Sequence, residues 1–143
     1  MTLALSMTLD DLIEEFDELG DWESKCEYLM DLGDDLPEIT PELKSEDNRV
    51  HGCQSNVWMA AEFSDDGSID LIADSDAKIV KGLVAVVLLA YSGHTAQKIL
   101  DTNIEAIFTR LGLNRHLSMA RRNGLSGMVK RVRNIAMSAL ADR

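Results

Sequence analysis

The chain has 143 residues, a formal net charge of −11 and two cysteines. This length predicts one domain, residues 1–143, that buries roughly 70% of its unfolded surface and needs no disulfide to fold. The longest apolar run, Leu83 to Tyr91, is far shorter than the ~20 residues of a membrane-spanning helix. We therefore expect no membrane partner.

The first six residues have neither the basic region nor the apolar core of a secretory signal. We therefore expect a cytoplasmic protein. In that reducing compartment an accessible thiol more often takes part in chemistry than in a disulfide.

Charge is distributed unevenly, with a net −13 over residues 1–50 and +6 over residues 111–143. The acidic first third argues against nucleic acid as a partner and is compatible with a basic protein partner. Solvated helix faces explain such charge more often, so the basic partner is the second of two interpretations.

The first 50 residues predict two helices and a loop. Thr8 can cap a helix whose apolar stripe ends at Leu19, and a second helix starts at Gly20-Asp21 and is expected to stop at Gly33. Thr40 followed by Pro41 is typical of a further helix start.

Residues 57–63 alternate between apolar and polar, which predicts a half-buried strand, and a turn at 64–67 leads to a second strand over 69–73. Val50 and its neighbours are expected to add a short preceding strand. The predicted fold class is α+β, a small antiparallel sheet of about three strands packed against several helices.

Asp74-Ser75-Asp76 is predicted to begin and cap a nearly all-apolar, buried central helix that ends at Gly93. Three more helices follow, over residues 95–100, over residues 103–111, and from Ser118 to near the C-terminus.

The segment 49–58 holds the main functional clue, because Cys53 follows Gly52 where a loop gives way to a strand. A thiol at a loop tip can be presented to a partner. His51 is a nearby base, and Gly52, Gln54 and Ser55 offer backbone donors to a thiolate. The alternatives are that Cys53 is a buried structural thiol and that His51 is an ordinary surface imidazole.

Three motifs together resemble the SufE family of sulfur-acceptor proteins, from about Trp22 to the C-terminal helix. They are Val50-x-Gly52-Cys53-Gln54-Ser55-x-Val57-Trp58, Asp74-Ser75-Asp76-Ala77-x-Ile79-Val80-x-Gly82-Leu83, and Leu117-Ser118-x-x-Arg121-x-x-Gly124-Leu125.

The resemblance implies a carrier that takes persulfide sulfur onto Cys53 from a pyridoxal-phosphate (PLP) cysteine desulfurase and stimulates that enzyme. The sulfur would pass on to an iron–sulfur scaffold, and the carrier itself would bind no cofactor. It also implies a loop that tucks Cys53 against apolar residues, for which Val57 and Trp58 are candidates. The motifs do not separate this form from a paralogue serving a second desulfurase, although Gly-Cys-Gln-Ser is closer to the iron–sulfur form.

Outside the Cys53 segment, Arg121 is the most informative residue, since a cation in the first turn of a helix opposes the helix dipole. Its charge is therefore expected to serve Asp74, Asp76 or an anionic substrate group, or else a structural ion pair. Asp74 is a second candidate for supporting the site or contacting the partner. Cys26 is expected to pack on an apolar helix face.

His94 and His116 lie at predicted helix ends, and the cysteines and histidines have no metal-ligand spacing, so we expect no metal. Two rival functions remain. A stand-alone thiol oxidoreductase would lack a resolving cysteine beside Cys53, which argues against an independent enzyme. In a pure interaction module, Cys53 would be incidental.

Overall fold

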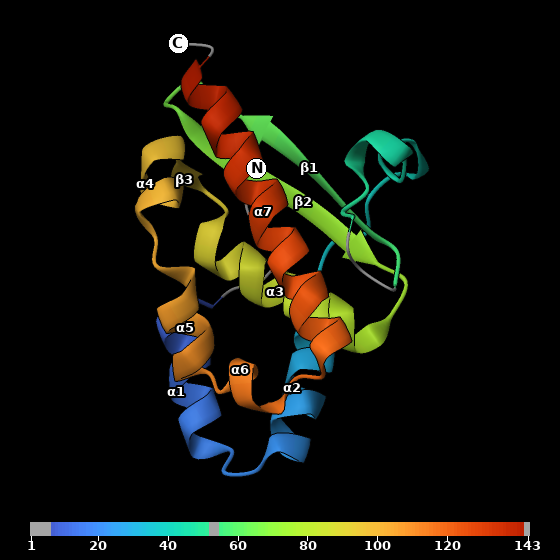
Figure 1. Ribbon diagram of the computed structural model, residues 1–143, viewed down its shortest axis with the longest axis vertical. Coiled ribbons are helices and arrows are strands. Elements are labelled where there is room, and N and C mark those ends of the chain that lie inside the picture. Colours follow the sequence, from blue (N-terminus) through green and yellow to red (C-terminus); the bar gives the residue numbers. More distant parts are fainter. Residues whose placement is uncertain (1–6, 52–54, 142–143) are drawn as a thin grey trace.

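The computed structural model describes residues 7–51 and 55–141, and in these residues helices cover a small antiparallel sheet (Figure 1). The strand order is β1-β2-β3, with both neighbouring pairs antiparallel. The predicted α+β class is confirmed. The strands are β1 (Val57–Phe63), β2 (Ser68–Ser75) and β3 (His94–Thr95).

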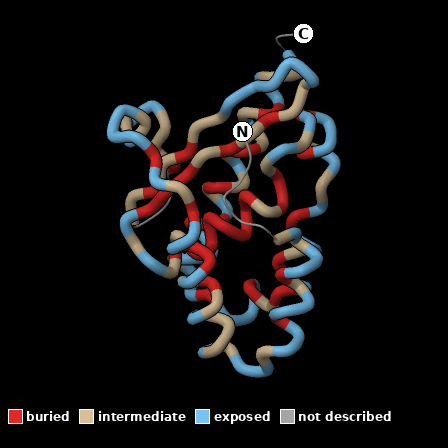
Figure 2. The backbone as a smooth tube through the Cα atoms, turned by 180° about the vertical axis from the view of Figure 1, so that it is seen from behind, coloured by how far each residue is buried: buried red, intermediate tan, exposed pale blue. Residues whose placement is uncertain are grey.

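The central helix is α3 (Lys78–Tyr91), in which ten of 14 residues are buried. Such a helix must be covered on all sides. It packs against β2, against α2 (Trp22–Asp34) and against α7 (Met119–Ala141). The view from behind shows these buried segments at the centre of the molecule, with exposed residues around them (Figure 2).

The N-terminal helix α1 (Leu9–Glu18) begins where the sequence predicts. The Thr8 side chain accepts a hydrogen bond from the Asp11 amide, and the Asp11 carboxylate accepts one from the Thr8 amide. This reciprocal pair satisfies two backbone donors at the helix start. At the other end of α1, Asp17 binds Arg110 of α5 (Ile104–Arg110) through two guanidinium donors.

The prediction that Gly33 ends the second helix is wrong, because Gly33 lies inside α2 and is buried. A Cβ atom on Gly33 would lie 2.8 Å from the Gly82 amide nitrogen of α3, and one on Gly82 would lie 2.4 Å from the Leu29 carbonyl oxygen. Both glycines are therefore used where the backbones of α2 and α3 cross closely.

The remaining helices are α4 (Ala96–Asp101), α5, α6 (Leu113–His116) and α7. The predicted helix starts at Thr95, Asn103 and Ser118 are confirmed, since each side chain accepts a hydrogen bond from a first-turn amide. The short helix α6 was not predicted, because four residues carry too little periodicity to recognise.

The prediction that Asp74-Ser75-Asp76 begins the central helix is also wrong. Asp74 and Ser75 are the last residues of β2, paired with Trp58 and Val57, and α3 begins only at Lys78. The third strand differs as well. It is formed by β3 next to β2, whereas the segment near Val50 contributes one isolated bridge, between Arg49 and Trp58.

Within residues 7–51 and 55–141, no helix is both long enough and apolar enough to cross a membrane.

Candidate functional site

Gly52, Cys53 and Gln54 lie outside the described residues, and the described part of the site consists of the segments on either side of them. The amide of Val50 donates to the Val57 carbonyl at 2.8 Å. This hydrogen bond joins Val50 to Val57, the first residue of β1, so the two flanks of the cysteine segment lie side by side there. Candidate residues Gly52, Cys53 and Gln54 fall between these flanks in the sequence.

The C-terminal flank is held at Asn56 by Ser75, the last residue of β2, and by Asp76, the residue after it. The Asp76 carboxylate accepts from the Asn56 amide at 3.1 Å and from its Nδ2 at 2.9 Å. In return, the Asn56 carbonyl accepts from the Asp76 amide at 3.3 Å and from Ser75 Oγ at 2.8 Å. Four hydrogen bonds thus fix Asn56, three residues after Cys53.

The N-terminal flank is the leading arm, residues 41–51, which contains two 3-10 turns, η1 (Pro41–Leu43) and η2 (Glu46–Asn48). This arm projects beside the sheet in Figure 1. Lys44 of the arm lies 3.4 Å from one oxygen of Asp74, and Lys81 of α3 lies 3.3 Å from the other.

Asp74 is only 4% exposed, so its two lysine partners stabilise a carboxylate that would otherwise be costly to bury. The Lys44 ammonium also lies 5.4 Å from the centre of the Trp58 ring, a cation–π contact. Asp74 therefore joins the arm, the sheet and the central helix. Asp74 is too buried to contact a partner directly, so of its two expected roles only support of the site stays a prediction.

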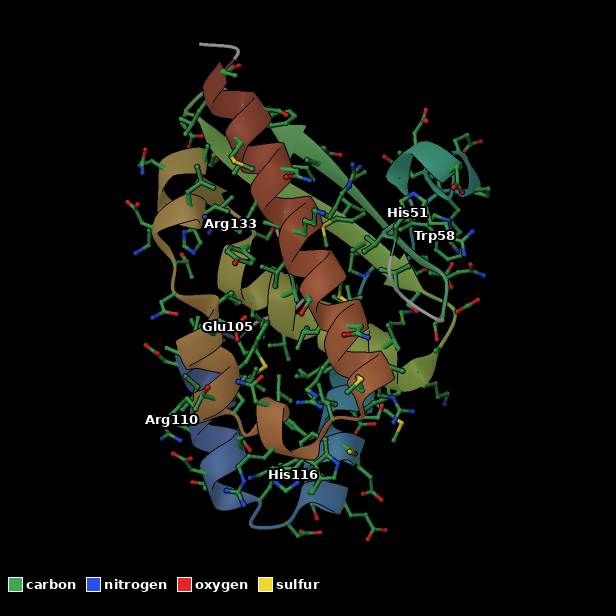
Figure 3. The ribbon with its side chains drawn as sticks, viewed as in Figure 1. His51, Trp58, Glu105, Arg110, His116 and Arg133 are labelled. Carbon is green, nitrogen blue, oxygen red and sulfur yellow. The ribbon has the colours of Figure 1, made fainter. Side chains whose placement is uncertain are left out.

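His51 ends the described part of the arm. Its side chain is 75% exposed, and its Nε2 lies 3.8 Å from Glu46 Oε1. His51 and Trp58 lie on the same side of α7 in Figure 3. An exposed imidazole two residues before Cys53 is placed to exchange protons with solvent or with a partner.

A cavity of about 260 Å³ opens beside Ser55, between α3 and α7. A water molecule takes up about 30 Å³ in the liquid, so this volume accommodates several atoms of a reacting group. The lining is mixed: most of the residues are apolar, and polar groups at Ser55, Ser118 and Arg121 share the surface with them. The lining residues are Ser55, Ala77, Ile79, Val80, Leu83, Ser118, Ala120, Arg121, Gly124 and Met128.

Val57 and Trp58, the residues expected to cover Cys53, do not contribute to this cavity. Val57 is fully buried in the core and Trp58 lies under Lys44, and neither lines the cavity. The sequence did place Ile79, Val80 and Leu83 in a buried helix. Their role here depends on α7, which lies about 40 residues further along the chain.

Arg121 lines the cavity and is exposed. Within the described residues no ion pair joins it to Asp74 or Asp76, so the structure does not bring these predicted partners together. Its positive charge does act on Cys26. Partial burial raises the pKa of the Cys26 thiol, and the Arg121 guanidinium opposes that rise.

Cys26 itself is a free, half-buried thiol, consistent with packing on the face of α2. Near it, Trp22 stacks on His116 with ring centres 4.7 Å apart. His116 is therefore exposed yet held by an aromatic contact that sequence spacing does not show. In Figure 3, His116 lies far from His51. Among the described histidines, cysteines and acidic residues, no group of three is close enough to hold a metal.

The roles of Asn56 and Asp76 in fixing the flank after Cys53 were not predicted from the sequence. Asp76 was interpreted as a helix cap, yet the residue before α3 is Ala77, which has no side-chain cap. The positions of Asn56 and Asp76 relative to the two predicted strands could have indicated this contact. A polar residue just before β1 and one just after β2 must meet when the two strands pair as an antiparallel hairpin.

The fold and the site define a small α+β protein in which both flanks of one cysteine segment are fixed by hydrogen bonds and the flank after the cysteine borders a cavity. The chain belongs to the SufE family: the family model described as an Fe–S metabolism associated domain matches residues 10–136. An uncharacterized SufE-like protein of Rhizobium etli is 43% identical over 132 residues, covering 90% of this chain and 89% of that protein.

A solution structure of a hypothetical protein from Thermus thermophilus has a similar fold, with a TM-score of 0.74. It covers 94% of this chain and 99% of that one at 22% sequence identity. At that identity the likeness supports the fold alone. The link to iron–sulfur metabolism comes from family membership.

Proposed function

We propose that this protein is a sulfur carrier that receives persulfide sulfur on Cys53 from a PLP-dependent cysteine desulfurase, stimulates that enzyme, and passes the sulfur to iron–sulfur cluster assembly. Membership of a family associated with Fe–S metabolism supports the pathway. The observation that carries the proposal is the cavity beside Ser55, two residues after Cys53 in the sequence.

The transfer step balances without an external oxidant or reductant. The Cys53 thiol gives up its proton, and the thiolate attacks the outer sulfur of the desulfurase persulfide. The sulfur–sulfur bond on the desulfurase breaks, a new one forms on Cys53, and the desulfurase cysteine leaves as a thiolate that takes up a proton. His51 is exposed close by in the sequence and suits the proton exchange.

The cavity suits the product of this step. A persulfide held against apolar side chains such as Leu83 and Met128 would be protected from other thiols and from oxidants. Arg121 at the same cavity would stabilise the anionic form of the bound sulfur, as a nearby cation does for a thiolate.

The test is intact-mass spectrometry after incubation with a cysteine desulfurase and free cysteine. Wild type should gain about 32 Da per sulfur atom added. Cys53→Ser should gain none and should not stimulate the desulfurase, because a hydroxyl does not accept persulfide sulfur. Cys26→Ser is the matched control and should load normally.

Full stimulation by Cys53→Ser would refute the carrier function and would favour an interaction module. Turnover of peroxide or disulfide by the protein alone would instead favour a thiol oxidoreductase. Running the assay with desulfurases of different assembly systems would separate the iron–sulfur form from its paralogue.

A further inference from the structure

One face of α7 holds the leading arm against the body of the protein. Gly127 and Arg131 are four residues apart on α7 and therefore lie on the same face of the helix. A Cβ atom on Gly127 would lie 2.6 Å from the His51 carbonyl oxygen and 3.4 Å from Val50 Cγ1. The arm therefore reaches the helix backbone at the residues that lead into the Cys53 segment.

Arg131 adds two hydrogen bonds to this contact. Its Nη2 donates to Asn48 Oδ1 at 3.3 Å and to the Met59 carbonyl at 3.0 Å. Asn48 in turn donates from Nδ2 to the Leu43 carbonyl at 3.0 Å. A single guanidinium therefore links α7, the first strand and both turns of the leading arm.

The position of Arg131 is costly. Its Nε is buried and has no hydrogen-bond partner among the described residues. A buried donor without a partner lowers stability, and a long flexible side chain could avoid the cost by turning to solvent. The side chain is thus held in place by its contacts with Asn48 and Met59.

We propose that Arg131 is a positioning residue for sulfur transfer, which it serves by fixing the leading arm, whose last described residue, His51, lies two positions before Cys53 in the sequence. This proposal rests on the proposed carrier function. Asp76 fixes the other flank through Asn56, so the two flanks are held by separate sets of hydrogen bonds. An arm fixed in advance loses less conformational entropy when the desulfurase docks.

The test measures desulfurase rate against carrier concentration for wild type and for variants with intact Cys53. Arg131→Met keeps most of the apolar stem and removes both hydrogen bonds. We expect its half-saturating concentration to rise about tenfold while the rate at saturation stays that of wild type. Arg131→Lys, with a single charged group in place of the planar fork, should give about a threefold rise.

Arg133→Met is the matched control. Arg133 lies two residues further along α7 and donates from Nη1 to the Leu100 carbonyl at 3.3 Å, on the side of the helix away from His51 and Trp58 (Figure 3). It should leave the half-saturating concentration unchanged. Asn48→Ala combined with Arg131→Met should have less effect than the product of the two single changes, because the two residues share a hydrogen bond.

The outcomes separate the two proposals. If wild type does not stimulate any cysteine desulfurase, the carrier function fails and the positioning role fails with it. If wild type stimulates but Arg131→Met has the same half-saturating concentration, only the positioning role is refuted. An equal rise in Arg133→Met, or a fall in the rate at saturation alone, would also refute it.

Discussion

Replacing Asp76 by alanine should release the flank after Cys53 without unfolding the protein. The change removes the two hydrogen bonds that the carboxylate accepts from Asn56, at 3.1 and 2.9 Å. It leaves the two bonds to the Asn56 carbonyl, from the residue 76 amide and from Ser75 Oγ. Both removed bonds are exposed and screened by solvent, so we assign about 0.5–1 kcal/mol to each, below the usual values for bonds to charged groups.

A total of about 1–2 kcal/mol corresponds to a roughly 5- to 30-fold increase in local opening at this flank. Amide hydrogen exchange at residue 76 reports it directly, because that amide keeps its acceptor in the variant and exchanges only when the flank opens. Stability to urea should change by less than the local figure. Asp65→Ala at the β1–β2 turn is a control that removes the same charge.

Unchanged exchange at residue 76 would show that Ser75 and the backbone alone hold Asn56, and the reasoning from the carboxylate would be refuted. Faster exchange in both Asp76→Ala and Asp65→Ala would point to lost charge as the cause. Global unfolding of Asp76→Ala would show that the flank cannot be released separately from the sheet.

Three further predictions follow from contacts elsewhere in the molecule. Gly82→Ala should lower the free energy of unfolding by about 2–3 kcal/mol, measured in urea, since α2 must move away from α3 to admit the new methyl group. Hydrogen bonding to Arg110 lowers the pKa of Asp17, so the wild type should exceed Asp17→Asn in stability at neutral pH. That advantage is present above the ordinary carboxyl value of 3.8 and should disappear as the pH falls through the lowered pKa, as thermal melts between pH 7 and pH 2 would show. Burial raises the pKa of Cys26 and Arg121 opposes it, so Arg121→Ala should slow iodoacetamide labelling of Cys26 in Cys53→Ser protein at pH 8, and faster labelling would contradict this electrostatic account.

Sequence patterns were sufficient for the class of fold and for most helix starts. Thr8, Thr95 and Asn103 were recognisable because capping depends on residues three positions apart, which are visible in any sequence. The strand at 57–63 was recognisable because its alternation is local. The strand at His94–Thr95 was not, since two residues show no alternation and their pairing with β2 depends on where α3 ends.

The three acidic and polar residues 74–76 show why the site was harder to predict than the fold. An Asp-Ser-Asp segment before an apolar run has the composition of a helix start. In the structure the strand continues through Ser75, which turns Asp74 toward two lysines and leaves Asp76 facing Asn56. Whether these residues begin a helix or end a strand depends on pairing with β1, a contact between segments that are distant in the sequence.

Gly33 gives the same lesson for a glycine. Near the end of a predicted helix, a glycine usually indicates termination, because it adopts a positive φ at low cost. Gly33 instead allows α2 to approach Gly82 of α3. Whether a glycine ends a helix or allows a close approach depends on the neighbouring helix, and a single sequence does not show which helices cross.

The helix α7 contributes to the candidate site through more residues than its sequence motif contains. The motif residues Arg121 and Gly124 line the cavity together with Met128. Gly127 and Arg131, one turn apart on a neighbouring face, contact the arm that precedes Cys53 in the sequence. One helix therefore contributes both to the cavity and to the contacts of the arm. A shift of α7 would change the two together, although this family motif includes residues at the cavity and not those that hold the arm.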